Sequence, residues 1–558
     1  MKMTEPMMLD IYPLHTQYRP EQSVSVMVEI SPDIADGSSL RFEIIHEWRS
    51  VKEVKLPVCA IRDSGSVVEF GAFPNGGYRI IATLSTGQSE YKARTAFDVR
   101  DHWRASPRYG FVCHFEPGQT EVSEVKNFFL KFHLNVVQFY DWMERQDALV
   151  PKHSEFTDPM GKTVSLNSIM ARLQVLGEIQ TTRFAYAAIV ASLKDYAQAH
   201  PEQGLYDNTG VQFNLIDTFY LMDISEGSSW RKHIIPEFAK VIEFGFDGLH
   251  LDQYGFPKSA VKSDGSTIWL DQAYASFIDE CRETLGEQVG LIYNAVSSYP
   301  VHTVSHAKQD AIYVEVWAPM TRYRHIVQLL TQLHAKTGGR KQVILAAYLH
   351  SCRNVTDEAA VSRTSLLLSA VIFASGGYHL ILGESGGMLT EAYYPDYSPI
   401  SSSIQKPLRA FYDILTADTD LLSGPDIVDL TWSFTGGNKW EIKIAGAPFS
   451  VEPDAGMVWV RVTHTKNGLL IHLINLLWVT DDIWDRVHDE PFQKAPSLDL
   501  TIEWNHPIQS VWTQIAEDAI WSQTEWNWKR QKWGKAVAVT VPSFDVWAMV
   551  FIPHTQND

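Results

Sequence analysis

The stretch FGFDGLHLDQYG (244–255) decides how the centre of this chain folds. In it Leu249 and Leu251 share one face of a strand, because successive side chains point to opposite sides. His250 and Asp252 share the other face, with Asp252 at the carboxyl end. The two leucines suit contact with helices, so the stretch predicts a strand of a helix-covered parallel sheet.

Short apolar runs of this kind recur along the central part of the chain, with longer helix-like segments between them. Residues 228–245 and 273–286 are amphipathic examples of these segments. Eight β/α units over roughly 280 residues predict a (β/α)₈ barrel. A ninth run, DTFYLMDI (217–224), is interpreted as an excursion before the fourth strand. The runs are YGFVCHF (109–115), VVQFYDWM (136–143), RFAYAAIVAS (183–192), FDGLHLDQ (246–253), VGLIYNAV (289–296), AIYVEVW (311–317), QVILAAY (342–348) and YHLILGE (378–384).

Segments of alternating, strand-like sequence flank this central part on both sides. The 558 residues exceed what one hydrophobic core accommodates, which predicts several domains. Residues 1–101 predict a small β-sandwich, followed by a linker at 101–110. The central part is expected to span 102–420, and strand-like runs in 421–558 predict a second β-sandwich.

Charge and motifs exclude several classes of function. A net charge of −19 argues against nucleic acid or an anionic membrane as partner. No apolar stretch is long enough to cross a membrane. The chain contains no complete GxxxxGK[ST] and no HExxH, and the widely spaced Cys59, Cys113, Cys281 and Cys352 form no metal-binding pattern. We expect no cofactor, no metal, and reduced, buried thiols.

The first 20 residues contain no continuous apolar segment of the kind that signal peptides have, because Glu5, Pro6 and Asp10 interrupt it. The chain as it stands is therefore expected in the cytoplasm. It is expected to be secreted if an export signal is missing from this sequence.

A second run, AIYVEVW (311–317), repeats the alternation of the first. Tyr313, Glu315 and Trp317 share one face, and Glu315 lies near the carboxyl end. Barrel enzymes place their active sites at that end, so Asp252 and Glu315 are expected at one mouth. The alternative is that each carboxylate is structural and bonded to an arginine or a backbone amide.

Paired carboxylates on two sides of a glycosidic bond are the machinery of glycoside hydrolysis. In a retaining enzyme one attacks the anomeric carbon and the other donates a proton to the leaving oxygen. We predict Asp252 as nucleophile and Glu315 as general acid/base, with the apolar bulk of Tyr313 and Trp317 raising the pKa of Glu315.

Other strand ends carry polar and aromatic side chains that suit sugar hydroxyls and ring faces, although each alone is more often a core residue. Asp247 falls on the helix-facing alternation and is interpreted as structural. The predicted substrate-binding residues are His114, Tyr140, Asp141, Trp142, Tyr186, His250, Gln253, Tyr254, Asn294, Trp317, Tyr348, His379 and Glu384.

At residues 244–255 and at AIYVEVWAP (311–319) the sequence resembles glycoside hydrolase family 66. The likeness extends to 378–384, 471–476 and 541–547. This family contains dextranases and cycloisomaltooligosaccharide glucanotransferases, which act on α-1,6-glucan.

The resemblance implies three parts in order: an immunoglobulin-like β-sandwich, the (β/α)₈ barrel and a Greek-key β-sandwich. It also implies that the family's nucleophile falls on Asp252 and its acid/base on Glu315, and that the substrate is an α-1,6-glucan such as dextran or isomaltooligosaccharides.

The chain departs from the family in two respects. It shows no export signal, and the interval 348–378 leaves no room for the carbohydrate-binding module that the cyclising members carry. The second departure favours a plain hydrolase. A transglycosylase with the same Asp/Glu pair and an inactive carbohydrate-binding protein remain alternatives, and the oligomeric state is left open.

Overall fold

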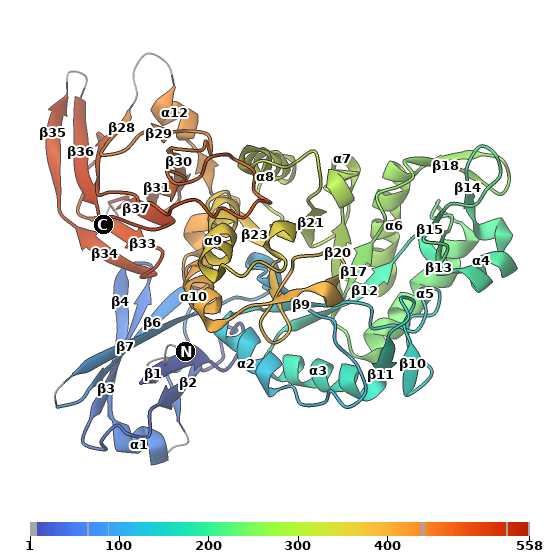
Figure 1. Cartoon of the computed structure of the whole chain (residues 1–558), viewed down its shortest axis with the longest axis horizontal. Coiled ribbons are helices and arrows are strands. Elements are labelled where there is room, and N and C mark those ends of the chain that lie inside the picture. Colours follow the sequence, from blue (N-terminus) through green and yellow to red (C-terminus); the bar gives the residue numbers. More distant parts are fainter. Residues whose placement is uncertain (1–7, 64–65, 88, 437–440, 532–533, 556–558) are drawn as a thin grey trace.

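The computed structural model describes residues 8–63, 66–87, 89–436, 441–531 and 534–555. Figure 1 shows β-rich N- and C-terminal parts beside each other at one end, a larger α/β body, and a small β lobe at the far end. Residues 1–7, which belong to the segment examined for an export signal, lie outside the described residues.

The N-terminal part consists of two antiparallel sheets with one hydrophobic cluster of their side chains. Leu40, Phe42 and Ile44 alternate toward that cluster along one strand, as the period-2 pattern predicts. The immunoglobulin-like connectivity stays a prediction. One sheet has the order β1 (Leu9–Pro13), β2 (Ser25–Ile30), β5 (Val67–Glu69), and the other β4 (Arg49–Pro57), β3 (Ser39–His46), β6 (Gly76–Ser85), β7 (Glu90–Val99), with α1 (Val58–Asp63) between β4 and β5.

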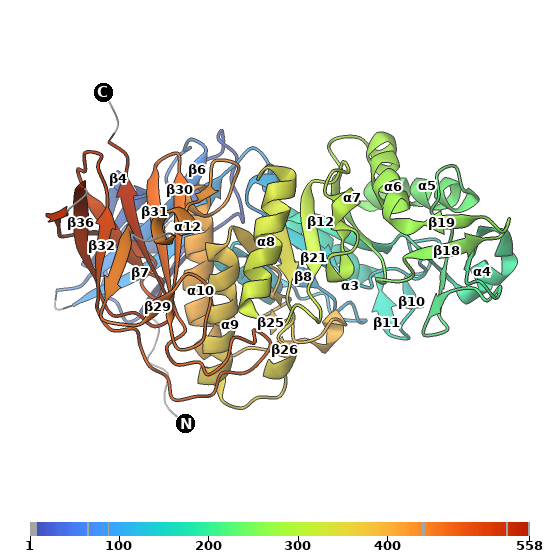
Figure 2. The ribbon, with the colours of Figure 1, turned by 90° about the horizontal axis from the view of Figure 1, so that it is seen from above.

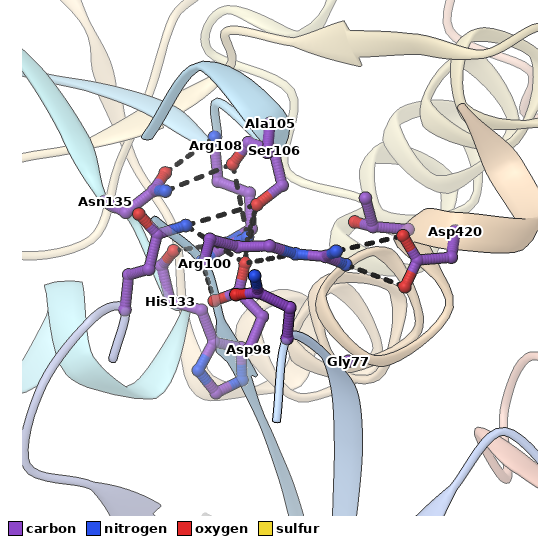
Figure 3. Close-up of polar contacts among 12 residues, drawn as sticks. Gly77, Asp98, Arg100, Ala105, Ser106, Arg108, His133, Asn135 and Asp420 are labelled. Atoms are coloured by element: carbon purple, nitrogen blue, oxygen red, sulfur yellow. Dashed lines mark hydrogen bonds and ion pairs between the residues drawn. The ribbon is translucent and has the colours of Figure 1, made fainter. Parts of the chain in front are cut away.

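The predicted linker at 101–110 is a largely buried segment. It contains a short helix, η1 (Trp103–Ala105), and Arg108 is fully buried. Arg108 donates to both carboxylate oxygens of Asp98, at 2.8 and 3.0 Å (Figure 3). Although burial raises the pKa of Asp98, the charge and hydrogen bonds of Arg108 outweigh it, and the pKa is lowered. A buried ion pair has to keep both partners, so this segment is part of the core.

The central part is a large curled sheet in which each of the eight predicted runs coincides with a strand. Neighbouring strands are parallel from β8 to β23. Residues 377–383 contact both ends of this series, because β23 pairs with β22 and β24 pairs with β8. The strands are β8 (Tyr109–Val112), β9 (Val136–Phe139), β12 (Thr182–Ala188), β17 (Gly248–Asp252), β20 (Gly290–Asn294), β21 (Ala311–Glu315), β22 (Val343–Ala346), β23 (Gly377–His379) and β24 (Leu382–Gly383), extended by β25 (Gly387–Met388) and β26 (Ser398–Pro399).

Helices connect these parallel strands and cover the sheet. Figure 2 shows α8, α9 and α10 on the side that faces the β-rich flanks. There α10 contacts β6 and β7 of the N-terminal part, and α9 contacts β31 (Gly468–Asn475) of the C-terminal part. The helices are α2 (Ser123–Lys131), α3 (Leu166–Glu178), α5 (Ser229–Phe244), α6 (Leu270–Leu285), α7 (Val301–Val304), α8 (Tyr323–Thr337), α9 (Glu358–Ala374) and α10 (Ser402–Ala417), with short helices η3 (Val296–Ser298), η4 (His350–Cys352), η5 (Tyr394–Asp396) and α11 (Thr419–Leu422).

The excursion predicted at 217–224 is confirmed. Its strand β16 (Phe219–Leu221) pairs with β13 and β15 and not with the large sheet. This small sheet and a second one form the β lobe of Figure 1. Their other strands are β13 (Ala191–Leu193), β15 (Asn214–Leu215), β14 (Leu205–Tyr206), β18 (Ser259–Lys262) and β19 (Thr267–Trp269), near α4 (Lys194–Ala199) and η2 (Pro201–Gln203), and a separate hairpin joins β10 (Glu155–Thr157) to β11 (Thr163–Ser165).

The C-terminal part again has two sheets that share a hydrophobic cluster. Greek-key connectivity stays a prediction. A loop of residues 476–497 leaves it and runs to the central part. One sheet follows β27 (Val428–Asp429), β30 (Val458–Thr465), β31, β37 (Trp547–Pro553), β33 (Val511–Ile515), β34 (Ile520–Thr524), with β29 (Phe449–Ser450) on β30; the other follows β28 (Ile442–Ala445), β32 (Leu498–Glu503), β36 (Gly534–Val541), β35 (Trp526–Gln531), and α12 (Thr431–Thr435) precedes β28.

The structure bears on two expectations drawn from composition. All four cysteines are free, but Cys59 is exposed, because α1 lies at the edge of the N-terminal part; the expectation of four buried thiols was wrong in this one case. Among the described residues, no helix combines the length and the apolar character that crossing a membrane requires.

Candidate active site

Asp252 and Glu315 end two strands of the large sheet and lie on either side of Asn294. Asn294 ends β20, the strand between them in the sheet. Its amide nitrogen Nδ2 donates to Oδ1 of Asp252 at 2.8 Å and to Oε2 of Glu315 at 3.3 Å. The parallel register therefore brings both carboxylates to one mouth, as the alternation predicted.

The shared nitrogen limits how far apart the carboxylates can be. Two oxygens at 2.8 and 3.3 Å from one atom are separated by at most the sum of those distances, 6.1 Å. Retaining glycosidases hold their carboxyl groups about 5–5.5 Å apart, and inverting ones about 6.5–9.5 Å. The upper limit concerns one oxygen of each carboxylate and is compatible with the first class.

A tyrosine hydroxyl completes the environment of each carboxylate. Tyr186 donates to Oδ2 of Asp252 at 2.8 Å, and Tyr348 donates to Oε1 of Glu315 at 2.9 Å. Each carboxylate thus accepts hydrogen bonds from Asn294 and from a tyrosine, and such bonds stabilise the charged form. Of the structural alternatives, no ion pair joins either carboxylate to an arginine among the described residues, whereas the backbone at Gln253 does hydrogen-bond to Asp252.

Burial raises the pKa of both carboxyl groups. The pKa of Asp252 rises to about 7, first because the group is buried and second because of the charge of Glu315; Tyr186 and Asn294 oppose the rise. Burial also raises the pKa of Glu315. The direction is the one predicted from apolar bulk around Glu315, and hydrogen bonds from Tyr348, Asn294 and Trp317 oppose the rise. Because the charge of Glu315 acts on Asp252, the two groups titrate as a coupled pair.

Aromatic rings and a third carboxylate surround the pair. Tyr140 stacks on Tyr394 with ring centres 4.3 Å apart. Asp141 is buried with its backbone in the left-handed region (φ 50°), and its Oδ2 atom has no hydrogen-bond partner within the described part of the chain. Burial, followed by the charges of Asp158 and Asp252, raises the pKa of Asp141 well above its usual range. An unpartnered buried carboxyl at the mouth suits a sugar hydroxyl.

Other predicted residues lie on the rim. Tyr254 and Trp317 are half-buried, and the ring of Trp317 lies 5.8 Å from that of Tyr348. The charge of Asp252 acts on Tyr254, which places the phenol near the pair. His114 lies farther out, hydrogen-bonded to Glu116 at 3.1 Å. Tyr140, Tyr254, Trp317 and Tyr348 remain candidates for sugar contact.

Trp142 is not a sugar platform, and this prediction was wrong. Its side chain is fully buried, its indole N–H donates to the carbonyl oxygen of Tyr186 at 3.1 Å, and its ring packs on Phe244 and Phe246. The chain turns after β9, so the alternation of the strand does not continue to Trp142.

Four further candidates are buried and bound to protein groups, so they support the site from behind. His250 bonds to the hydroxyl of Tyr109 at 2.9 Å, and burial lowers its pKa to about 3. Gln253 donates to the carbonyl oxygens of Asn294 and Tyr299. His379 contacts Ser369 and the carbonyl of Ala347, and Glu384 accepts the backbone N–H groups of Cys113 and His114. Their predicted contact with substrate is not supported.

Two residues near the pair were missed by the sequence analysis. Tyr394 comes from the segment after β25. Its hydroxyl lies 3.1 Å from the hydroxyl of Tyr313 and donates to the amide oxygen of Gln138 at 3.3 Å. His350 follows β22, and its ring lies 5.6 Å from that of Trp317. The aromatic run YYPDY (393–397) was the available signal for the first; nothing in the sequence singled out the second.

Asp247, interpreted as structural, pairs with Arg183 through two hydrogen bonds of 2.7 and 2.8 Å. Within the described ranges no group of three or more His, Cys, Asp or Glu side chains is arranged to hold a metal ion.

Comparison with known proteins identifies the family. The model of glycosyl hydrolase family 66 matches residues 68–551. The chain belongs to glycosyl hydrolase family 66. The match contains both carboxylates, the whole central part, the end of the N-terminal part and most of the C-terminal part.

Relatives in family 66 are distant in sequence. A cycloisomaltooligosaccharide glucanotransferase of Niallia circulans is 23% identical over 97% of this chain and 71% of that protein. A dextranase of Streptococcus salivarius is 20% identical over 86% of this chain and 67% of that protein. The crystal structure of a Paenibacillus sp. cycloisomaltooligosaccharide glucanotransferase complexed with cycloisomaltoheptaose superposes with a TM-score of 0.85 at 20% identity, covering 98% of this chain and 100% of that one. The overall fold is therefore that of the family.

Proposed function

We propose that this family 66 protein is a retaining glycoside hydrolase that cleaves α-1,6-glucosidic bonds in dextran or isomaltooligosaccharides. The observation that carries the proposal is the amide of Asn294, which donates to both Asp252 and Glu315 and so keeps one oxygen of each within 6.1 Å. The linkage comes from the relatives, one of which is a dextranase.

In the proposed mechanism Asp252 attacks the anomeric carbon while Glu315 donates its proton to the glycosidic oxygen. The bond to that oxygen breaks, the leaving sugar departs as an alcohol, and a glycosyl ester forms on Asp252. Glu315, now ionised, takes a proton from water, whose oxygen attacks the same carbon and releases the Asp252 carboxylate. Two inversions give net retention.

The environment of each group suits its proposed role. The hydroxyl of Tyr186 and the amide of Asn294 stabilise an ionised Asp252, which attack requires. Burial of Glu315 favours a protonated acid. Asp141, Tyr140, Tyr254 and Trp317 are proposed to contact the sugar.

The proposal extends to architecture. Pairing of residues 377–383 with both β22 and β8 supports a closed (β/α)₈ barrel. Separate hydrophobic clusters in the flanks support boundaries near 101 and 420, with an immunoglobulin-like and a Greek-key β-sandwich on either side.

A transglycosylase is the second candidate, favoured by the likeness to glucanotransferases. In it a sugar hydroxyl takes the place of water in the second step. Within the described residues, η4 and α9 account for the regular structure between β22 and β23, which leaves no inserted module there and favours hydrolysis.

Incubation with dextran, isomaltooligosaccharides and an α-1,4-glucan tests the proposal. We expect new reducing ends from dextran, and NMR should show that the α-anomer forms first. Release of the β-anomer from dextran contradicts retention, higher kcat/KM on the α-1,4-glucan contradicts the linkage, and cyclic or elongated products assign the transglycosylase. A protein that binds dextran but releases nothing is the inactive binding protein.

A further inference from the structure

The loop of residues 476–497 connects the C-terminal part to the segment that follows Glu315. Ile483 forms an isolated antiparallel bridge with Arg322. The indole N–H of Trp484 donates to the carbonyl oxygen of Met320 at 2.6 Å. The loop is therefore attached to the chain that leaves the carboxyl end of β21.

The same loop holds a second segment, the one that follows β22. Oδ1 of Asp485 accepts the backbone N–H of Ser351 at 3.0 Å, and Oδ2 lies 3.3 Å from Nδ1 of His350. One carboxylate from the C-terminal part thus binds both the backbone and the imidazole of η4. Asp485 and His350 are 135 residues apart in sequence.

His350 in turn lies against the residues around Glu315. Its ring centre is 5.6 Å from that of Trp317 and 5.9 Å from that of Tyr348. Tyr348 donates its hydroxyl to Glu315 at 2.9 Å, and Trp317 follows Glu315 by two residues. The side chain of Tyr348 therefore connects the imidazole of His350 to Glu315, the proposed acid/base.

The charged groups that act most strongly on His350 are acidic: Asp485 from the loop, Glu391 from the segment after β25, and Glu315 from β21. The hydrogen bond to Asp485 is the main cause that raises the pKa of His350, against the effect of partial burial. Nε2 of His350 lies 3.9 Å from Glu391, which is itself paired with Arg353 at 2.6 Å. A positive imidazole at this place stabilises an ionised Glu315, which the second step needs.

We propose that the loop 476–497 completes the catalytic site from the C-terminal part: Asp485 holds the imidazole of His350 against Trp317 and Tyr348, and so positions Glu315. The inference rests on the proposed role of Glu315. His350 and Asp485 are positioning residues, and the C-terminal part belongs to the catalytic unit.

The test uses Asp485→Asn and His350→Gln in the full-length chain. An asparagine still accepts the N–H of Ser351 but has no charge for His350. On dextran we expect kcat to fall about tenfold with KM within about twofold, and the basic limb of kcat/KM to move up by about half a pH unit, because Glu315 loses a nearby positive charge. The double variant is expected to be no worse than either single one, since both changes break the same chain of contacts.

Asp481→Asn is the matched control. Asp481 lies in the same loop but bonds within it, to the backbone of Ile483 and to Arg486. The control should keep wild-type kinetics. Thermal unfolding verifies that each variant is folded; if Asp485→Asn is not, His350→Gln, which leaves the loop's backbone contacts intact, carries the test.

An NMR titration of His350 separates this inference from the proposed function. Asp485→Asn should lower the pKa of His350 by about one unit, and Asp481→Asn should not. If the wild-type protein cleaves no α-glucan, the proposed function fails and the titration alone decides the contact. If the wild-type protein cleaves dextran, two results overturn the inference while the function stands. In the first, Asp485→Asn behaves like Asp481→Asn in kinetics or titration. In the second, the effects of Asp485→Asn and His350→Gln on kcat add in the double variant.

Discussion

Replacing Asp252 by Asn should abolish turnover and at the same time stabilise the fold. Asp252 is half-buried beside Glu315, and its pKa is raised from 3.8 to about 7. The native state therefore holds a proton more tightly than the unfolded chain does. Ionised Asp252 destabilises the native state most above pH 7. Asparagine removes this destabilisation without changing the size of the side chain.

The magnitude follows from the pKa shift. One pKa unit corresponds to about 1.36 kcal/mol, so a shift of about three units sets an upper limit of about 4 kcal/mol. Two effects reduce this limit. Part of the pKa shift comes from the charge of Glu315, and an asparagine has only one oxygen to accept the hydrogen bonds that Tyr186 and Asn294 donate to Asp252. We expect Asp252→Asn to raise the free energy of unfolding by about 1–3 kcal/mol at pH 8, or Tm by about 1–3 °C.

The direction of the pKa shift determines how the stability gain of Asp252→Asn changes with pH. A raised carboxyl pKa contributes stability that is fully present below the unfolded value of 3.8 and is lost as pH rises through about 7. The advantage of Asp252→Asn should therefore be largest above pH 7 and vanish near pH 4. Calorimetric melting of wild type and variant at pH 4, 6 and 8 measures it.

Asp247→Asn is the matched control, since Asp247 lies at the start of the same strand region but is paired with Arg183. Its replacement should lower Tm, because a bidentate ion pair is lost. Equal melting of Asp252→Asn and wild type at pH 8 would refute the assignment of a costly buried charge. Measurable turnover by the variant, in the absence of contaminating wild-type protein, would refute the nucleophile.

Three further predictions concern the same site. Glu315→Gln should abolish dextran cleavage but spare glycosylation by substrates with activated leaving groups, with azide restoring the second step; near wild-type activity on dextran would contradict the acid role. Trp317→Ala should raise KM for dextran several-fold by removing a half-buried ring at the mouth, and a KM within twofold of wild type would exclude it as a sugar contact. Activity should be unchanged in EDTA, because an Asp/Glu pair supplies both attack and protonation; a loss that Ca²⁺ restores would reveal a structural metal site.

Much of the fold was predictable because local pattern reports on local structure. Each of the eight apolar runs coincides with a strand of the large sheet, and the run at 217–224 lies outside it, as predicted. Alternation along 248–252 and 311–315 places Asp252 and Glu315 on the inner face. A period of two residues determines which side chains share a face, and this needs no knowledge of distant contacts.

Local pattern failed where the strand ends. Trp142 follows a strand by three residues and was expected at the mouth, but the chain turns at Asp141 and buries the indole. The segment 101–110 contains glycine, proline and charged residues, as linkers do, yet it is fixed by the buried pair of Arg108 and Asp98.

What the sequence by itself determined is therefore the order of strands and helices, the family, and the two carboxylates at strand ends. Only the tertiary structure decided which groups meet them: Asn294 between both carboxylates, Tyr394 from a later segment, and Asp485 from the C-terminal part behind His350. The physical reason is that strand periodicity acts over a few residues. Contacts between these residues, which lie 21 to 135 positions apart in sequence, depend on how whole elements pack, and no spacing in the sequence encodes those distances.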